Sequence, residues 1–175
     1  MPDTPNFSPV ANTGRRLCLG ALGATALMLA GCGRAEPLEV HGTDIPGAKF
    51  ARSFSLKDPA GRVRTLEEFK GRAVPVFFGF THCPDVCPTT LATLATALGR
   101  MGRDADRLTV VFVTLDPERD TPATLRDYLA SFDPRIRGFV GTTEQVARMA
   151  DAYHVAFKRV PTKDGDYTMQ HSATV

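Results

Sequence analysis

Hydrophobic positions from residue 73 onward follow two alternating periods. Short, nearly continuous apolar runs of strand length are separated by stretches with apolar residues three and four positions apart, the spacing of an amphipathic helix. The run at residues 108–116, LTVVFVTLD, is the clearest strand, because a buried parallel strand is apolar on both faces. The predicted strands cover residues 73–80, 108–116 and 136–141. The predicted helices that follow them cover residues 88–101, 121–132 and 142–155.

Local signals mark the ends of these elements. Thr121 is suited to cap the second helix, with Pro122 at its first position, where no amide hydrogen is needed. Thr142 and Gln145 have the spacing of a capping box at the start of the third helix. Turn-forming residues inside two further extended segments predict β-hairpins before and after the alternating part. The predicted hairpin turns are DPAG at residues 58–61 and KDGD at residues 163–166.

A chain in which strands alternate with helices predicts an α/β fold with a central, mostly parallel sheet. Right-handed crossovers place helices on both faces of such a sheet, and the hairpins are added at its sides. Residues 33–48 lack periodicity and are rich in Gly and Pro, so they are interpreted as a tether. The folded domain is predicted at residues 49–175. Val175 falls inside a predicted strand, so the domain is expected to be truncated at its C-terminus.

Residues 1–32 have the pattern of an export signal. Arg15 and Arg16 precede an apolar stretch of about fifteen residues, shorter than the roughly 20 that a spanning helix needs. The stretch ends in LAGC, which looks like the lipobox of a bacterial lipoprotein, and on that resemblance Cys32 is lipidated. The alternative is an uncleaved anchor helix. Both interpretations tether the domain to the bacterial cell membrane, facing the periplasm or the exterior.

Composition and charge restrict the class of protein only broadly. The chain has 175 residues, of which 43% are hydrophobic and 23% charged, as in a globular domain with a substantial core. The formal net charge is +2, the signs are interspersed, and no basic run is longer than a pair. We therefore expect no nucleic acid partner and no polybasic membrane patch.

Two cysteines of the predicted domain lie four positions apart. Cys18 and Cys32 belong to the targeting segment, which leaves Cys83 and Cys87. In an oxidising compartment such a pair is a disulfide, a redox couple or a metal site. Pro84 suits a first helical position, so Cys83 is expected at the N-cap with Cys87 one turn on. Both sulfurs would then share one face at the carboxyl edge of the sheet, where the helix N-terminus favours thiolates.

Two thiolates suit Cu(I) or zinc, but two ligands rarely satisfy either metal, so a third donor is expected. His41 lies in the tether, His82 is interpreted as a loop residue beside the site, and His154 as a cation at a helix C-terminus. His171 follows the second hairpin turn and is the best third donor. Met169 shares the strand face of His171, where a packing role is favoured over metal binding.

Three motifs in order resemble the SCO/SenC family. They are FFGFTHCPDVCPTTL at residues 77–91, VTLDPERDTP at 113–122 and YTMQHSATV at 167–175, and the similarity covers roughly residues 50–175. Members of this family have a thioredoxin-like fold. They are membrane-tethered copper-binding proteins that help to assemble the binuclear copper centre of cytochrome c oxidase.

The resemblance implies a site and its partners. Cys83, Cys87 and His171 would bind copper, as Cu(I), Cu(II) or both. Asp116 and Arg119 are interpreted as a strand-to-helix turn in which Asp116 caps and Arg119 pairs with a carboxylate, with support of the site or contact with a partner as the alternative. The implied partners are the copper-bearing oxidase subunit, other copper chaperones or thiol reductants, and the membrane through the lipid anchor.

Two functions follow, and a third is weaker. The first is a metallochaperone, which is not an enzyme. The second is a thiol–disulfide oxidoreductase, in which Cys83 attacks a partner disulfide and Cys87 resolves the mixed disulfide. The third, a peroxidase, is suggested by the similarity of residues 54–71 to peroxiredoxin-like domains, but the threonine that those enzymes carry ahead of the cysteine does not precede Cys87.

Overall fold

The computed structural model describes residues 43, 47, 50–51, 54–173 and 175. The chain separates into two units, Met1–Ile45 and Pro46–Val175, and the helices and strands of the fold belong to the second. The predicted export signal and Cys32 lie outside the described residues. Within the described part, no helix has both the length and the apolar character needed to cross a bilayer.

Strands and helices alternate as the hydrophobic pattern predicts. In chain order the elements are β1 (Ser55–Lys57), β2 (Val63–Thr65), the 3-10 helix η1 (Leu66–Phe69), β3 (Val76–Gly79), α2 (Val86–Met101), the 3-10 helix η2 (Gly102–Arg107), β4 (Val110–Thr114), α3 (Pro122–Leu129), β5 (Ile136–Phe139), α4 (Thr143–Ala152), β6 (Phe157–Pro161) and β7 (Tyr167–His171).

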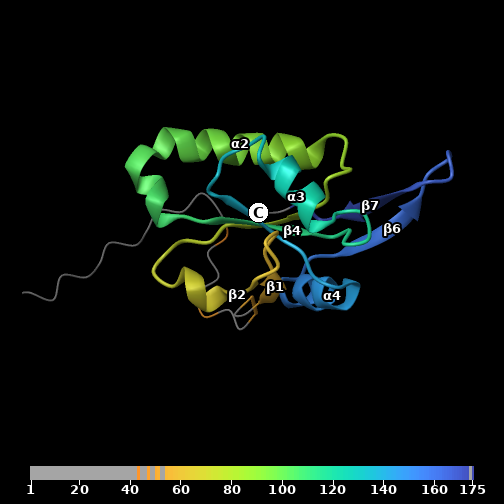
Figure 1. The fold of residues 1–175 in the computed structure, drawn as a ribbon, viewed down its shortest axis with the longest axis horizontal. Coiled ribbons are helices and arrows are strands. Elements are labelled where there is room, and N and C mark those ends of the chain that lie inside the picture. The colour runs from red at the N-terminus through yellow and green to blue at the C-terminus, as the bar shows by residue number, and fades with distance from the viewer. Residues whose placement is uncertain (1–42, 44–46, 48–49, 52–53, 174) are drawn as a thin grey trace, which may run out of the picture. The chain divides into compact units, whose positions relative to one another are not determined.

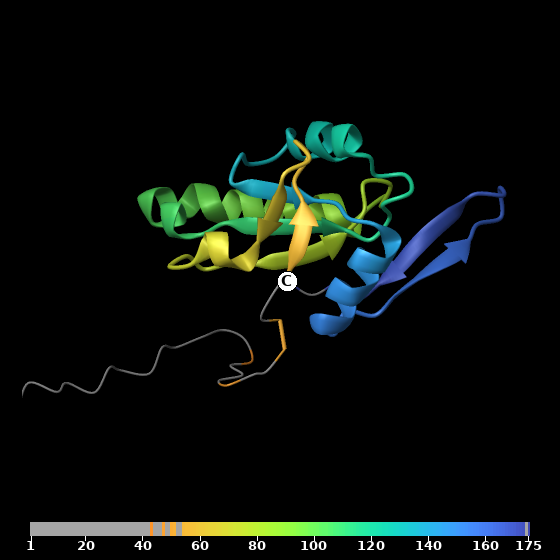
Figure 2. The same ribbon diagram turned by 60° about the horizontal axis from the view of Figure 1, so that its bottom comes forward.

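The central sheet is parallel and has the order β3-β4-β5. Its register places Phe77 opposite Phe112, and Phe112 opposite Gly138. The antiparallel hairpin β1–β2 joins the sheet through Lys57 and Val140, whose backbone groups exchange two hydrogen bonds of 2.9 Å. The hairpin β6–β7 forms a separate antiparallel pair that extends from the rest of the fold (Figure 2). The predicted α/β class is confirmed.

Helices cover both faces of the sheet, because side chains alternate between faces along each strand. Figure 1 shows α2 and α3 on one side of β4, with α4 and the β1–β2 hairpin on the other. Phe77 and Phe112 pack with Leu125 of α3 on the first side. Phe78 and Val146 of α4 pack on the second.

The predicted caps of α3 and α4 are present. The Thr121 side chain accepts a hydrogen bond from the Thr124 amide, and Pro122 is the first residue of α3. Thr142 and Gln145 form the capping box of α4. That helix ends at Ala152, short of the predicted residue 155, because His154 adopts a left-handed φ of 54° that a helix cannot contain.

The predicted start of the first helix is wrong. Helix α2 begins at Val86 with Asp85 as its N-cap, so Cys83 precedes the helix instead of capping it. The Cys83 amide instead donates to the Phe80 carbonyl at 3.3 Å and closes a turn after β3.

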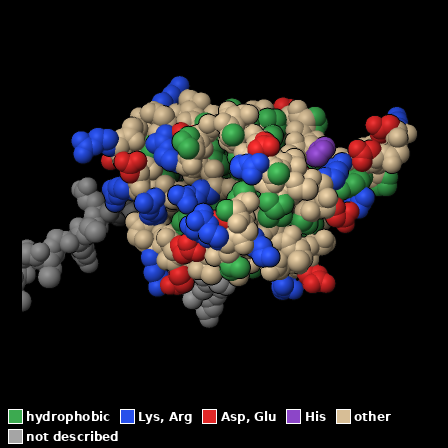
Figure 3. All heavy atoms as spheres, viewed as in Figure 1, with side chains coloured by type: hydrophobic (Ala, Val, Ile, Leu, Met, Phe, Trp, Pro, Cys, Tyr) green, Lys and Arg blue, Asp and Glu red, His purple; other side chains and the backbone are tan. Residues whose placement is uncertain are grey.

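The surface carries charges of both signs. Figure 3 shows Lys and Arg side chains over one face of the molecule with Asp and Glu side chains among them. A groove of about 460 Å³ lies between the β1–β2 turn and the α3–β5 segment. Its basic lining residues are Arg62, Arg64, Arg126 and Arg137. Neither Cys83 nor Cys87 lines this groove, so the chemistry of the dithiol pair lies elsewhere.

Candidate metal and redox site

Cys83 and Cys87, called the dithiol pair below, meet at the carboxyl edge of the sheet. Cys83 lies in the turn after β3, and Cys87 is the second residue of α2. The Cys87 amide donates to the Cys83 sulfur at 3.4 Å. The first amides of a helix have no partner within the helix, so the Cys83 sulfur satisfies one of them although Cys83 lies outside the helix. The predicted proximity of the two cysteines is therefore achieved by a different local geometry.

The Cys87 sulfur rests against the backbone of β3. A Cβ atom placed on Gly79 would lie 2.9 Å from the Cys87 sulfur and 2.9 Å from Cε2 of Phe112. Real contacts are not that short, so only glycine at this position lets the helix bring its sulfur so close to the strand. Cys87 is fully buried, whereas Cys83 is half-buried.

Burial raises the pKa of the Cys87 thiol to about 12, and the neighbouring Cys83 adds to the effect. This direction is the opposite of the one expected from the helix N-terminus. The reason is desolvation, because a thiolate with no exposure to water loses more hydration than the helix terminus restores. Cys87 is therefore a thiol at neutral pH, and any metal that binds there must displace its proton.

His171 reaches the dithiol pair from the end of β7. Its Nε2 lies 3.7 Å from the Cys87 sulfur, although 84 positions separate the two residues. Its Nδ1 lies 2.8 Å from the Ser172 carbonyl oxygen. A carbonyl only accepts, so Nδ1 carries the hydrogen and the lone pair of Nε2 faces the sulfur. That tautomer is the one a metal-binding imidazole needs.

The separation of Cys87 and His171 fits a shared metal. A metal bonded to both at about 2.3 Å from sulfur and about 2.0 Å from nitrogen, with an angle of roughly 110–120°, requires the two atoms to be about 3.5–3.8 Å apart. The observed 3.7 Å lies in that interval. The described part of the chain contains no group of three His, Cys, Asp or Glu side chains assembled as a metal site. Ligation by Cys83, Cys87 and His171 together therefore stays a prediction.

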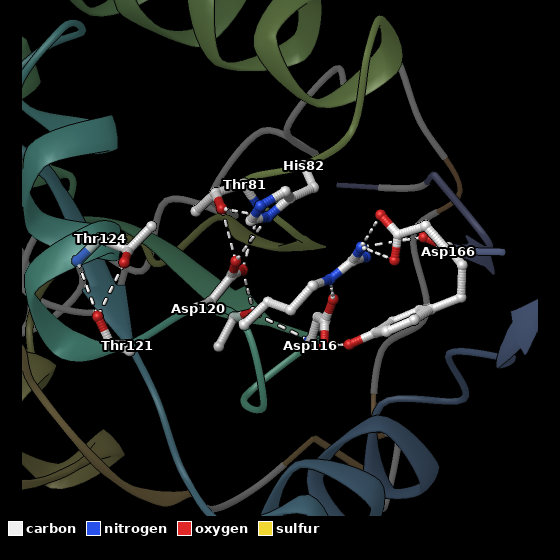
Figure 4. Close-up of polar contacts among 10 residues, drawn as sticks. Thr81, His82, Asp116, Asp120, Thr121, Thr124 and Asp166 are labelled. Atoms are coloured by element: carbon white, nitrogen blue, oxygen red, sulfur yellow. Dashed lines mark hydrogen bonds and ion pairs between the residues drawn. The ribbon is translucent and has the colours of Figure 1, made fainter. Parts of the chain in front are cut away.

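A second set of contacts fastens the β6–β7 hairpin to the turn after β4. The Tyr167 hydroxyl donates to Asp116 at 2.8 Å, and Nε of Arg119 donates to the same carboxylate at 2.6 Å. Arg119 also donates to the Tyr167 carbonyl at 3.0 Å, and its guanidinium lies 3.7 Å from the centre of the Tyr167 ring. Figure 4 shows Asp116 with the hydrogen bonds that reach its carboxylate, and we call Asp116, Arg119 and Tyr167 the hairpin anchor.

The hairpin anchor bears on both interpretations of Asp116 and Arg119. The two residues do pair with each other in the turn, but the part of the first interpretation in which Asp116 caps a helix is wrong, since Thr121 is the N-cap of α3. They also hold Tyr167, which lies four residues before His171 on β7. A role in supporting the site is therefore a proposal with a geometric basis, while contact with a partner stays a prediction.

Sequence reasoning did not single out Asp120, Thr81 or Thr114. Asp120 is fully buried behind the turn that carries Cys83. Its carboxylate accepts hydrogen bonds from the Thr81 amide at 3.0 Å and from the hydroxyls of Thr81 and Thr114 at 2.5 Å each. The sequence could have indicated Asp120, because it follows a buried parallel strand by only a few residues. Residues at that position lie at the carboxyl edge of the sheet, where the dithiol pair also lies.

The remaining candidates lie beside the site or away from it. His82 is half-exposed, and its Nδ1 lies 3.1 Å from the Thr81 hydroxyl and 3.6 Å from Asp120. His154 packs against Phe50, with ring centres 4.7 Å apart. Met169 packs against the apolar residues on both sides of the sheet, in keeping with a packing role. His41 lies outside the described residues.

A parallel sheet flanked by helices, with two thiols at its carboxyl edge on the first strand-to-helix turn, defines a thioredoxin-like dithiol domain. Comparison with known proteins specifies the family. The SCO1/SenC family model matches residues 42–175, and the chain belongs to this family. The resemblance seen in the three sequence motifs is thereby confirmed.

Relatives and solved structures agree with this assignment. The chain is 40% identical over 125 residues to the mitochondrial SCO2 homolog of Bos taurus, covering 70% of this chain and 47% of that protein. It thus spans about half the length of the first curated relatives it matches. A Stutzerimonas stutzeri protein described as copper-binding is 34% identical over 95% of this chain and 83% of its own length. Copper-bound ScoI of Bradyrhizobium japonicum is 50% identical, with a TM-score of 0.66 over 69% of this chain and 77% of that one.

Proposed function

We propose that this protein is a copper metallochaperone, not an enzyme, and that it holds copper by Cys83, Cys87 and His171. The observation that carries the proposal is the approach of His171 Nε2 to the Cys87 sulfur at 3.7 Å, with the lone pair of the imidazole facing the thiols. The copper-bound structures of relatives support the choice of metal.

The donor set suits copper in either oxidation state. Thiolates are soft ligands that select Cu(I), and an imidazole nitrogen extends the site to Cu(II). Cys87 supplies a buried sulfur, and His171 supplies nitrogen from a separate element. Cys83 lies half-buried beside Cys87 and would admit a partner's ligands during transfer.

A second candidate function is thiol–disulfide exchange. The difference in burial between the two cysteines favours it, since Cys83 is accessible to attack a partner disulfide and Cys87 is sheltered. The Cys83 thiolate would form a mixed disulfide and release one partner thiolate. Cys87, after losing its proton, would then attack the Cys83 sulfur and release the second. The partner gains two electrons, and the dithiol pair becomes a disulfide.

The proposed setting follows from the family and from the N-terminal pattern. The copper acceptor would be the copper-bearing subunit of cytochrome c oxidase, with other copper chaperones or thiol reductants as further partners. A lipid on Cys32 would attach the domain to the bacterial cell membrane, facing the periplasm or the exterior.

Titration of the reduced protein with Cu(I) under anaerobic conditions tests the proposed function. We expect one copper per chain and loss of both titratable thiols of the dithiol pair on binding. Binding of Cu(II) is followed by thiolate-to-copper absorption in the visible range. A protein that binds no copper, yet exchanges rapidly with a model disulfide, would contradict the chaperone function and favour the second candidate.

Replacement of Cys32 tests the membrane anchor. We expect Cys32→Ala to leave the precursor unlipidated, because the modified sulfur is absent, and to abolish labelling by a radioactive fatty acid. The replacement Cys18→Ala is the matched control and should label normally. If Cys32→Ala still fractionates with membranes and keeps its apolar segment, the uncleaved anchor helix is the correct interpretation.

A further inference from the structure

Asp120 is a buried carboxylate that neither the dithiol pair nor the hairpin anchor uses. It has no exposure to water. Three groups donate to it, namely the Thr81 amide and the hydroxyls of Thr81 and Thr114 (Figure 4). An ionised carboxylate only accepts hydrogen bonds, and a protonated one must also donate. This set of donors is therefore the environment of a negative charge.

Little on the protein compensates that charge. In the described residues no Lys or Arg forms an ion pair with Asp120, and its sole ion-pair neighbour is His82 at 3.6 Å. The Thr81 hydroxyl donates to Asp120, so its oxygen accepts from Nδ1 of His82 at 3.1 Å. The His82 ring is half-exposed and in contact with solvent. The carboxylate thus acts as a fixed charge inside the fold.

The charge is attached to the turn that carries Cys83. Thr81, which Asp120 holds by two hydrogen bonds, is two residues before Cys83. A Cβ atom on Gly79, two residues before Thr81, would lie 2.9 Å from the Cys87 sulfur, so this part of the chain lies close against that sulfur. Phe80, between Gly79 and Thr81, is buried and apolar. Charges in such surroundings interact strongly and are screened little by salt.

We infer that Asp120 sets the oxidation-state preference of bound copper by stabilising Cu(II) relative to Cu(I). Two thiolates and a neutral imidazole carry one net negative charge with Cu(I) and none with Cu(II). The Cu(II) site is therefore more positive than the Cu(I) site by one charge. A fixed anion nearby stabilises the Cu(II) form relative to the Cu(I) form. The inference rests on the proposed copper function and adds a specific role for a residue outside the ligand set.

A fixed anion acts on the thiols as well as on the metal, because a negative charge nearby disfavours a thiolate. An anion that disfavours a thiolate favours a cation at the same place. Because Cu(I) and Cu(II) would displace the same protons from the same donors, the effect on the thiols cancels in the ratio of the two copper affinities.

The test is to measure the ratio of the Cu(II) and Cu(I) affinities in Asp120→Asn. This replacement removes the charge of the side chain and keeps its shape. We expect the affinity for Cu(II), relative to that for Cu(I), to fall by about tenfold, the order of magnitude of a single-charge interaction at intermediate dielectric. The one-electron midpoint potential of bound copper would then rise by about 59 mV. Direct electrochemistry and competition with chromogenic copper chelators measure the two quantities. Asp120→Ser also removes the charge and should shift the potential in the same direction.

Two controls separate charge from geometry. Thr114→Val removes a hydrogen bond to Asp120 but keeps the carboxylate, and it should leave the ratio unchanged. Asp127→Asn makes the same change of net charge at an exposed side chain of α3 and should also leave it unchanged. The inference is overturned if the ratio of Cu(II) to Cu(I) affinity is unaltered in Asp120→Asn. It is also overturned if Thr114→Val changes this ratio by the same amount as Asp120→Asn. Failure of the unsubstituted protein to bind copper would instead contradict the proposed function.

Discussion

Cys87→Ser is expected to lower the affinity for Cu(I) by more than about 100-fold. Structural zinc sites gain about 10–16 kcal/mol from four ligands, which is about 3 kcal/mol per ligand, and every 1.4 kcal/mol is tenfold in affinity. Serine offers a hard, neutral oxygen in place of a soft thiolate. The buried position of Cys87 also means that no other donor from solvent can replace it. Competition with a Cu(I) chelator of known affinity measures the loss.

The matched variant is Cys83→Ser, which removes the other thiol from a half-exposed turn. We expect a similar loss of Cu(I) affinity but a smaller effect on the free energy of unfolding. Serine at the fully buried position 87 loses the close packing of the sulfur against β3 and must be desolvated, whereas serine at position 83 stays partly solvated. Stoichiometric Cu(I) binding by the Cys83→Ser, Cys87→Ser double variant would contradict the assignment of the site.

His171→Ala is expected to separate copper binding from thiol chemistry. The affinity for Cu(II) should fall by about 100-fold, because Cu(II) requires nitrogen in its shell, and the affinity for Cu(I) by about tenfold, because the two thiolates remain. The rate of reaction of the dithiol pair with a model disulfide should change little, since exchange requires only an attacking and a resolving thiol. Titrations with each copper ion and stopped-flow exchange measure the two properties.

The hairpin anchor provides the control for this experiment. Tyr167→Leu keeps the imidazole but removes the hydroxyl contact with Asp116 and the stacking of Arg119. We expect it to weaken Cu(II) binding less than His171→Ala, because the ligand is present but less firmly placed. Unchanged copper affinities in His171→Ala, together with a large loss of disulfide exchange, would show that His171 serves the thiol reaction.

Local sequence signals determined most of the fold. The apolar run that becomes β4 is buried at every position, so burial on both faces could be read from residue types alone. The caps at Thr121 and Thr142 were predicted because a cap acts within four residues of its own chain. The four-residue spacing also indicated that Cys83 and Cys87 lie close together, although the expected shared helix face is wrong because Cys83 precedes α2. Each of these features depends on near neighbours in the chain.

The chemistry of the site was decided by the tertiary structure. The helix terminus suggested an acidic thiol at Cys87, but burial against Gly79 and Phe112 raises its pKa instead. Asp120 acquires its surroundings from Thr81, 39 positions away, and Tyr167 reaches Asp116 across 51 positions. His171 approaches the Cys87 sulfur across 84 positions. Residue types and spacing identify the groups that can react, whereas desolvation and long-range contacts set their charge, and both exist only once the chain has folded.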